Sequence, residues 1–265
     1  MKICMAGACG RMGRRILEMT AAAPDAEAVS AFDSPANAGI RIDFGAESRQ
    51  PQTLTVTDNL ESALADADAV IDFTHASVCV AHARTAASLG KAVVIGTTGL
   101  TPVQQEELAA IAEAVPVVYA PNMSVAVNLL FKLTSETAKR LGLEYNCEIM
   151  EIHHNLKKDS PSGTAVRLAE NAAAELGLDY EKDVIHGREG MIGERPQREI
   201  GMHALRGGDV VGEHTVFFIG PGDRIELSHK SNTRDHYARG ALTAVRYALK
   251  SPAGLYDMQD VLGLR

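Results

Sequence analysis

The sequence predicts an α/β protein: a Rossmann-like, doubly wound parallel sheet, followed by a second α+β domain that carries a mixed or antiparallel sheet. The first 120 residues alternate short apolar runs with longer alanine-rich segments of helical period, which is typical of βαβ units. After residue 199, by contrast, three strand-like segments follow one another across glycine-rich turns with no helix between them. This change of pattern predicts two domains.

In the first domain, short apolar strands are separated by helices. We expect strands at Lys2–Ala6, Ala28–Phe32, Ala69–Phe73, Ala92–Ile95 and Val115–Tyr119. We expect helices at Arg11–Ala22, Ala76–Leu89 and Pro102–Glu113, the last with Thr101 as its N-cap and Pro102 at its first position. Strands that are apolar on both faces require helices on both sides of the sheet.

After Ala120-Pro121-Asn122 the pattern changes to that of a second domain. We expect helices at Val125–Arg140 and Thr164–Leu176, and strands at Tyr145–His153, Ile200–Leu205, Val210–Ile219 and Arg224–Ser231. The Arg234–Lys250 segment has a helical period and is expected to pack back on the first domain. We therefore assign residues 1–123 and 234–265 to a dinucleotide-binding domain, and residues 124–233 to a domain that binds substrate and forms the oligomer.

The composition is that of an ordinary globular chain. Its 265 residues include 26 Lys and Arg against 34 Asp and Glu, and the net charge of −8 disfavours nucleic acid and anionic membranes as partners. No apolar run reaches the roughly 20 residues of a membrane-spanning helix, and the run after Lys2 is too short and too glycine-rich for a signal peptide. Cys4, Cys9, Cys79 and Cys147 form no C-x-x-C pair, so we expect free thiols in the cytoplasm, without a disulfide or a metal site.

A glycine-rich turn follows the first predicted strand and leads into a helix: Gly7-Ala8-Cys9-Gly10-Arg11-Met12-Gly13. Glycines at such a turn let the backbone approach a diphosphate at the helix N-terminus. Cys9 stands where the common G-x-G-x-x-G pattern has its second glycine, so a purely structural turn is the alternative. Asp33 follows the second predicted strand, roughly 20 residues further on, where an acidic side chain binds the adenosine ribose hydroxyls. Together the two features favour dinucleotide binding.

The choice between NADH and NADPH depends on the residues at this ribose. Asp33 disfavours a ribose phosphate, and Ser34 follows it where enzymes that bind this phosphate often have Arg. Because Arg11 or Arg14 could still reach such a phosphate, we expect NADH with NADPH tolerated. Two loops after later strands would line the nicotinamide half, although the second is equally consistent with an ordinary turn: Phe73-Thr74-His75 and Gly96-Thr97-Thr98-Gly99.

The densest polar segment is predicted where a strand of the second domain ends and a helix begins: Glu151-Ile152-His153-His154-Asn155-Leu156-Lys157-Lys158-Asp159-Ser160-Pro161-Ser162-Gly163-Thr164. The helix N-terminus at Ser162-Gly163-Thr164 offers N–H groups and hydroxyls to a carboxylate, and Lys157 and His154 add donors. Hydride transfer to an electron-poor double bond leaves a carbanion-like centre that needs a proton, for which His153 and Lys157 are the candidates. The alternative is a solvated turn, in which one of the two adjacent histidines is structural, because neighbouring strand residues point to opposite faces.

Four segments together resemble the 4-hydroxy-tetrahydrodipicolinate reductase family, also called dihydrodipicolinate reductases, of the diaminopimelate route to lysine. They are Gly7–Gly13, Gly96-Thr97-Thr98-Gly99, Ala120-Pro121-Asn122-Met123-Ser124-Val125 and His153–Thr164. The similarity runs through the whole chain and includes Arg206–His214 and Glu226–Lys230. The most specific part is the His-His-x-x-Lys-x-Asp-x-Pro-Ser-Gly-Thr run from His153, which a generic dehydrogenase has no reason to carry.

The resemblance implies a role for each matched residue. Six residues would hold the diphosphate, two would lie at the ribose and seven at the nicotinamide end: Gly7, Ala8, Cys9, Gly10, Arg11 and Met12; Asp33 and Ser34; Gly96, Thr97, Thr98, Ala120, Pro121, Asn122 and Met123. His153 and Lys157 would be the acid–base pair, His154 would contact substrate, and Gly163 with Thr164 would bind one carboxylate of a cyclic dicarboxylate. The implied reaction is the NADH- or NADPH-dependent reduction of the dehydrated ring to tetrahydrodipicolinate, by a homotetramer formed through the second domain.

Three positions depart from the family's usual residues. Cys9 replaces a frequent glycine, Ser34 stands where members that use NADPH well often carry Arg, and Asn155-Leu156 replaces more basic residues. These departures bear on cofactor preference and substrate affinity. Two other functions remain open on the sequence: a different two-domain dehydrogenase, for example one acting on an amino-acid semialdehyde, and a nicotinamide-sensing module without catalysis.

Overall fold

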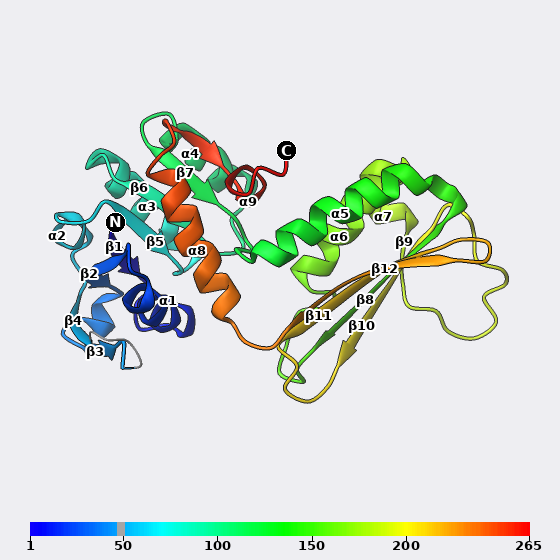
Figure 1. Cartoon of the computed structure of the whole chain (residues 1–265), viewed down its shortest axis with the longest axis horizontal. Coiled ribbons are helices and arrows are strands. Elements are labelled where there is room, and N and C mark those ends of the chain that lie inside the picture. Colours follow the sequence, from blue (N-terminus) through cyan, green and yellow to red (C-terminus); the bar gives the residue numbers. More distant parts are fainter. Residues whose placement is uncertain (47–50) are drawn as a thin grey trace. The chain divides into compact units, whose positions relative to one another are not determined.

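The computed structural model describes residues 1–46 and 51–265. The chain divides into two compact units, one formed by Met1–Val125 with Arg234–Arg265 and the other by Ala126–Thr233. Each unit has a sheet of its own (Figure 1). The first unit is discontinuous in sequence because the C-terminal segment packs into its hydrophobic core.

The first unit contains a sheet whose described strands run in the order β13-β7-β6-β5-β1-β2-β4-β3. The bounds are β1 (Lys2–Ala6), β2 (Glu27–Phe32), β3 (Arg41–Phe44), β4 (Gln52–Thr57), β5 (Ala69–Asp72), β6 (Ala92–Ile95), β7 (Pro116–Tyr119) and β13 (Gly254–Tyr256). Neighbouring strands are parallel except β3 and β4, which are antiparallel. The strand order reverses direction at β1, as in a doubly wound fold.

Helices cover both faces of this sheet. One face packs against α1 (Arg11–Ala22), α8 (Asp235–Ala248) and α9 (Met258–Val261), and the other against α2 (Leu60–Leu64), α3 (Ala76–Ser88) and α4 (Pro102–Ile111). Alternate strand residues enter the two cores: Ile3 and Met5 join the first, and Cys4 and Ala6 join the second. The predicted α/β fold class is thereby confirmed.

The smaller elements of this unit were not predicted from the sequence. Strands β3 and β4 form an antiparallel hairpin at one end of the sheet, and Ile42 and Val56 from it enter the core. Strand β13 and helix α9 are only three and four residues long. Segments this short contain too few residues for a period of 2 or 3.6 to be recognised.

The second unit is built on a mixed sheet in the order β12-β11-β8-β10-β9. Its strands are β8 (Asn146–His153), β9 (Val184–His186), β10 (Ile200–Arg206), β11 (Gly212–Ile219) and β12 (Arg224–Ser231). Strand β10 is parallel to β8 and β9, whereas β11 is antiparallel to β8 and β12. The sequence analysis did not expect β9.

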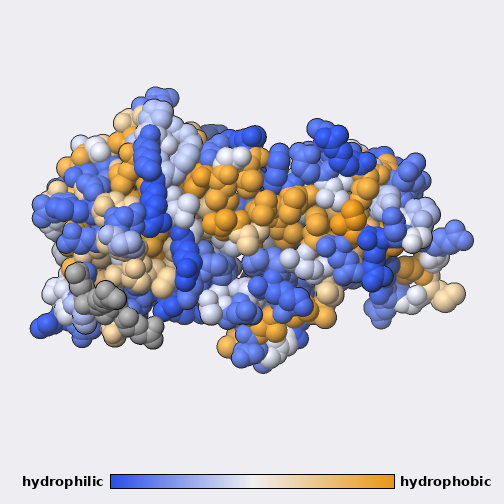
Figure 2. Space-filling model, viewed as in Figure 1, coloured by the Kyte–Doolittle hydropathy of each residue, from blue (hydrophilic) through white to orange (hydrophobic). Residues whose placement is uncertain are grey.

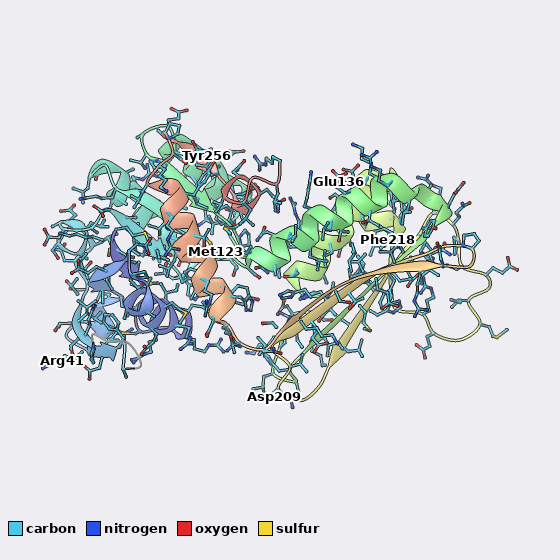
Figure 3. The ribbon with its side chains drawn as sticks, viewed as in Figure 1. Arg41, Met123, Glu136, Asp209, Phe218 and Tyr256 are labelled. Atoms are coloured by element: carbon cyan, nitrogen blue, oxygen red, sulfur yellow. The ribbon has the colours of Figure 1, made fainter. Side chains whose placement is uncertain are left out.

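Helices α5 (Val125–Leu141) and α6 (Gly163–Leu176) lie over one face of this sheet, and α7 (Tyr180–Asp183) follows α6 (Figure 1). Phe218 is fully buried in the core between the sheet and these helices (Figure 3). Along β8 the burial alternates, so that Cys147, Ile149, Glu151 and His153 face this core. Two of the four buried side chains are therefore polar, and both lie at the same end of the strand.

Apolar side chains remain exposed along α5. Val125, Leu129 and Leu133 follow one another at intervals of four residues, and each is more than 40% exposed. Figure 2 shows an apolar band over this helix. Spacing of this kind places the three side chains on one stripe of the helix.

Candidate active site

The turn between β1 and α1 is packed too tightly for side chains at two of its glycines. Gly7 has a φ of +84°, and a Cβ there would lie 2.5 Å from the carbonyl oxygen of Phe73. A Cβ on Gly13 would lie 2.1 Å from the carbonyl oxygen of Gly7. Helix α1 begins after Gly10, which provides no side-chain cap, so its first N–H groups are available to an anion.

Asp33 follows β2 and lies beside this turn. Its carboxylate accepts hydrogen bonds from the N–H groups of Cys9 and Ser34, at 2.9 and 2.8 Å, and from Nδ2 of Asn37 at 2.9 Å. Partial burial raises the pKa of Asp33, but these hydrogen bonds outweigh it and the net shift is downward. Asp33 is therefore an ionised acceptor held in place by three donors. Asn37 was not among the site residues predicted from the sequence.

The thiol of Cys9 stays protonated near neutral pH. Burial and the neighbouring Asp33 carboxylate raise the pKa of Cys9 above its ordinary value. A neutral thiol adds no negative charge to a turn that is suited to a diphosphate. Arg14 Nε donates to the Cys9 carbonyl at 3.3 Å, which brings a guanidinium to the same turn.

A buried carboxylate joins the loops that follow β5 and β6. Asp72 is 1% exposed, and its Oδ1 accepts from the Thr74 N–H, the Thr74 hydroxyl and the Thr97 hydroxyl, at 3.0, 2.7 and 2.8 Å. Its Oδ2 lies 2.7 Å from Nδ1 of His82 on α3. The ring of Phe73 packs against Gly96, where a Cβ would lie 2.1 Å from Cζ. Both loops were predicted from the sequence to lie at the site, but Asp72 was not.

The segment after β7 is also held by a close contact. Ala120 N donates to the Ile95 carbonyl at 3.1 Å, and Asn122 Oδ1 accepts from Ser124 N at 2.9 Å. Met123 lies beside α8 (Figure 3), where a Cβ on Gly240 would be only 1.7 Å from its carbonyl oxygen. The carboxyl ends of β1, β2, β5, β6 and β7 thus carry all the residues of the first unit that the sequence analysis placed at a dinucleotide.

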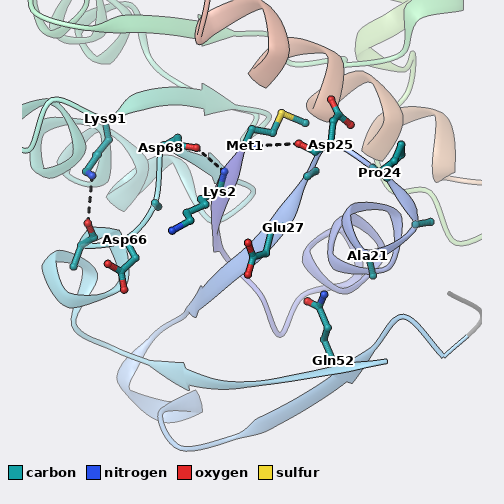
Figure 4. A pocket seen from close by; sticks show the side chains of 15 residues that line it. Met1, Lys2, Ala21, Pro24, Asp25, Glu27, Gln52, Asp66, Asp68 and Lys91 are labelled. Carbon is teal, nitrogen blue, oxygen red and sulfur yellow. Dashed lines mark hydrogen bonds between the residues drawn. The ribbon is translucent and has the colours of Figure 1, made fainter. Parts of the chain in front are cut away.

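A large open hollow of this unit lies at the amino ends of the strands (Figure 4). Residues at the amino ends of the strands line it, and several are already paired. Lys2 N donates to Asp68 Oδ2 at 2.7 Å, the N-terminal amine donates to the Asp25 carbonyl at 2.8 Å, and Lys91 donates to the Ala65 carbonyl at 3.4 Å. Ligands of open α/β sheets bind at the carboxyl ends, so this hollow is not the candidate site.

In the second unit, His153 ends β8 in contact with a fully buried carboxylate. Its Nδ1 lies 2.5 Å from Oε2 of Glu151, and its side chain is 10% exposed. Arg206 on β10 binds the same carboxylate with both terminal nitrogens, at 2.8 and 2.9 Å. Ser162 N, at the N-cap of α6, donates to Oε1 at 3.0 Å.

The loop after β8 brings the remaining predicted residues together. Lys157 Nζ donates to both carboxylate oxygens of Asp159 at 2.9 Å, and this hydrogen bond lowers the pKa of Asp159. His154 N donates to the Val210 carbonyl at 2.7 Å, which holds the loop against the turn that contains Asp209 (Figure 3). Nδ1 of His154 is buried and has no protein partner among the described residues.

The N-terminus of α6 is fixed by Ser162 and His214. Ser162 Oγ accepts from Ala165 N at 3.2 Å and lies 2.9 Å from Nε2 of His214 on β11. Burial, followed by the nearby His153, lowers the pKa of His214 to about 3, so this histidine is neutral. A Cβ on Gly163 would meet no heavy atom within 4 Å, so the space beside this residue is open. A small anion can therefore approach the helix N-terminus at Gly163.

Within residues 1–46 and 51–265, no three His, Cys, Asp or Glu side chains are grouped as ligands for a metal ion. In the same part of the chain, no helix has the length and apolar character needed to cross a membrane.

The first unit is a Rossmann-type nucleotide-binding domain, and the second carries the loop from His153 to Lys157, the His-Lys loop. This combination defines a two-domain oxidoreductase. The dihydrodipicolinate reductase N-terminus model matches residues 1–123, and the C-terminus model matches residues 126–262. The chain therefore belongs to the dihydrodipicolinate reductase family of the diaminopimelate route to lysine, as the sequence analysis predicted. The match of the second unit argues against the alternative of a different dehydrogenase that shares only the first domain.

Curated relatives agree with this assignment. The chain is 49% identical to the 4-hydroxy-tetrahydrodipicolinate reductase of Aromatoleum aromaticum, over 100% of this chain and 96% of the relative. It is 48% identical to that of Desulfotalea psychrophila, over 100% and 98%. Among solved structures, the dipicolinate-bound dihydrodipicolinate reductase from Paenisporosarcina sp. TG-14 shares the fold, with a TM-score of 0.77, 23% identity and 97% of each chain covered.

Proposed function

We propose that this protein reduces 4-hydroxy-2,3,4,5-tetrahydrodipicolinate to tetrahydrodipicolinate with loss of water, using NADH or NADPH, in the diaminopimelate route of lysine biosynthesis. The observation that carries the proposal is the cluster at the end of β8. There His153 and Ser162 N at the start of α6 bind the same Glu151 carboxylate, and Lys157 lies in the loop between them, so that two candidate proton donors flank a helix N-terminus suited to a carboxylate. A sensing module without catalysis has no need of such a cluster.

The residues of the first unit fit a nicotinamide dinucleotide. Gly7 and Gly13 leave a turn in which no Cβ fits, and α1 offers N–H groups to a diphosphate. Asp33 is an ionised acceptor for the ribose hydroxyls, which favours NADH, whereas Ser34 gives a ribose phosphate no cation. We therefore propose NADH as the preferred cofactor, with NADPH accepted. When bound, the dinucleotide supplies the hydride.

The residues of the second unit fit a cyclic dicarboxylate. Gly163 and Thr164 in the first turn of α6 would bind one carboxylate, and His154 and Lys157 would add hydrogen bonds and charge. Ser162, which was expected from its place at the helix N-terminus to bind the same carboxylate, is proposed to act indirectly. Its N–H and hydroxyl already bind Glu151, Ala165 and His214, so in the proposal it shapes the helix end that receives the carboxylate.

The reaction needs a proton as well as a hydride. Once water has left the hydroxylated ring, hydride addition to the conjugated system leaves a carbanion-like centre. In the proposed mechanism His153 and Lys157 hold the proton that this centre takes up, His153 through Nε2 and Lys157 through Nζ. The pair acts as the acid–base system of the proposed reaction.

We further propose a homotetramer that forms through the second unit and is located in the cytoplasm. Support comes from the sheet face opposite α5 and α6, which carries apolar side chains. Leu205 and Ile219 there are 44% and 39% exposed, and Met150, Ile152 and Phe217 are only half-buried. A light-scattering mass equal to one chain would contradict the tetramer.

The test is the loss of NADH absorbance, with NADPH in parallel, on addition of substrate freshly made from pyruvate and aspartate semialdehyde by the preceding synthase. We expect rapid loss that depends on this protein and is faster with NADH. Folded protein that binds NADH but gives no turnover with either cofactor would overturn the proposed activity. The ratio of the two rates tests the proposed role of Asp33 and Ser34.

A further inference from the structure

Glu151 is a buried carboxylate to which neither the family resemblance nor the proposed reaction gives a role. It has no exposed surface, and three elements of the second unit donate to it. Arg206 from β10 binds both oxygens, Ser162 N from the start of α6 binds Oε1, and Nδ1 of His153 lies 2.5 Å from Oε2. A carboxylate that binds the proposed acid and the proposed substrate-binding helix end connects two functional parts.

The charge of Glu151 determines where the His153 proton lies. Burial raises the pKa of Glu151, but the hydrogen bonds from His153 and Arg206 have the larger, opposite effect, and the net pKa is about 2. The carboxylate is therefore ionised near neutral pH and has no proton to donate. Since an ionised carboxylate only accepts hydrogen bonds, Nδ1 of His153 must carry the proton of their contact.

The other ring nitrogen of His153 lies toward β11. A Cβ on Gly212 would be 2.9 Å from Nε2, so a side chain at this position would crowd Nε2. The contact with Glu151 thus leaves Nε2 as the nitrogen that meets a ligand. A carboxylate that binds one ring nitrogen of a histidine fixes the orientation of the ring and determines which nitrogen carries the proton.

We infer that Glu151, clamped by Arg206, is a positioning residue that keeps the proton of neutral His153 on Nδ1 and so makes Nε2 the nitrogen that exchanges a proton with substrate. The inference rests on the proposed role of His153. Through Ser162 N, the same carboxylate sets the start of α6, so that the proton donor and the carboxylate-binding N-terminus are fixed relative to one another.

The charged and titratable groups around His153 agree with this role. Arg206 on β10 is paired with Glu151, and His214 on β11 lies with its ring centre 5.2 Å from that of His153 and is neutral. His229 on β12 has its pKa lowered by burial. Lys157 in the following loop is paired with Asp159. Among the described residues, the hydrogen-bond partner of the His153 ring is Glu151 and none of these other groups.

The test is nitrogen-15 NMR of histidine-labelled protein, in which the two neutral tautomers of imidazole give different spectra. The His153 signals are assigned by their loss in His153→Gln. In the wild type at high pH we expect His153 with its proton on Nδ1. The amide of Glu151→Gln can donate as well as accept, so it can also bind a His153 ring whose Nδ1 carries no proton. We therefore expect the Nε2–H tautomer to appear and kcat to fall by about 10- to 100-fold.

Glu148→Gln is the matched control. Glu148 is on the same strand and, like Glu151, binds arginine and histidine side chains, in its case Arg188, Arg195 and His203. Its hydrogen-bond partners among the described residues do not include His153. We expect the His153 tautomer of this variant to match that of the wild type. We also expect the Kd for NADH to be unchanged in Glu151→Gln, because the dinucleotide site is proposed in the other unit.

Each outcome decides the inference. A wild-type His153 with its neutral proton on Nε2, or an unchanged tautomer in Glu151→Gln, would overturn it, even if Glu151→Gln lost activity. Absence of turnover in the wild type would overturn the proposed function, and the spectra would still decide the role of Glu151. If Glu151→Gln does not fold, the wild-type spectrum decides alone.

Discussion

The Thr97 hydroxyl donates a hydrogen bond to Oδ1 of Asp72 over 2.8 Å, although the two residues are 25 positions apart. Thr74 N donates to the same oxygen and lies 2.9 Å from Thr97 Oγ1. One buried carboxylate therefore joins the two loops that the proposed function places at the nicotinamide. The conformation of these two loops therefore depends on Asp72, which need not touch the cofactor.

Replacing Asp72 should loosen both loops. We expect Asp72→Asn to lower the free energy of unfolding by about 1–3 kcal/mol, because buried donors lose a charged acceptor. The KM for NADH should rise by about 10-fold, or roughly 1.4 kcal/mol of binding free energy, with a smaller change in kcat. Asp68→Asn is the control, since Asp68 accepts from Lys2 N at the amino ends of the strands, away from the proposed cofactor site. An equal rise of KM in both variants would contradict a specific role of Asp72.

The glycine at position 13 should be required for cofactor binding. A Cβ there would lie 2.1 Å from the Gly7 carbonyl oxygen, so Gly13→Ala must displace the turn. We expect a loss of NADH affinity of at least about 10-fold in a fluorescence titration, and a lower Tm. Gly207→Ala is the control, because a Cβ at Gly207 meets nothing within 4 Å. Unchanged NADH affinity in Gly13→Ala would show that the diphosphate does not bind at this turn.

The lysine of the His-Lys loop should affect turnover and not cofactor affinity. We expect Lys157→Ala to lower kcat by about 10²- to 10⁴-fold, the usual contribution of a general acid, with an unchanged Kd for NADH. The adjacent Lys158→Ala is the matched control, because Lys158 is exposed and is given no role in the site. Retained turnover in Lys157→Ala would remove it from the acid–base pair.

Cofactor preference should respond to the residue beside Asp33. We expect Ser34→Arg to raise kcat/KM for NADPH by about 10-fold, because a guanidinium would face the ribose phosphate. The value for NADH should change little, since Asp33 keeps its contacts with Cys9 N and Asn37. Steady-state rates with both cofactors measure the ratio, and an unchanged ratio would place the adenosine ribose elsewhere.

Acid stability should depend on Glu151. Its pKa in the folded protein is about 2, below the ordinary value of 4.5, so the ionised carboxylate stabilises the fold above pH 4.5. This contribution, at most about 3 kcal/mol, is lost as the pH falls from 4.5 toward 2. Urea unfolding of wild type and Glu151→Gln across this range should show a smaller pH dependence in the variant. Parallel curves would mean that Glu151 has the same pKa in both states.

The fold class, the family and the local setting of the site could be predicted from the amino-acid sequence. Those features depend on short-range patterns: alternation along β8, helical periods in α1, α3 and α4, the glycine turn from Gly7 to Gly13, and the His153–Thr164 run. Each lies within one stretch of chain, where backbone geometry alone relates neighbouring residues.

The distant residues that support that site became apparent only in the folded chain. Arg206 meets Glu151 from 55 positions away, and Asn37 and His82 meet Asp33 and Asp72 from neighbouring elements. A weak signal was present, because Glu151 and His153 are two apart on a strand and must share a face. No local pattern, however, specifies which partner a buried carboxylate will find. That pairing follows from strand order and register, which place β10 beside β8 and Arg206 beside His153.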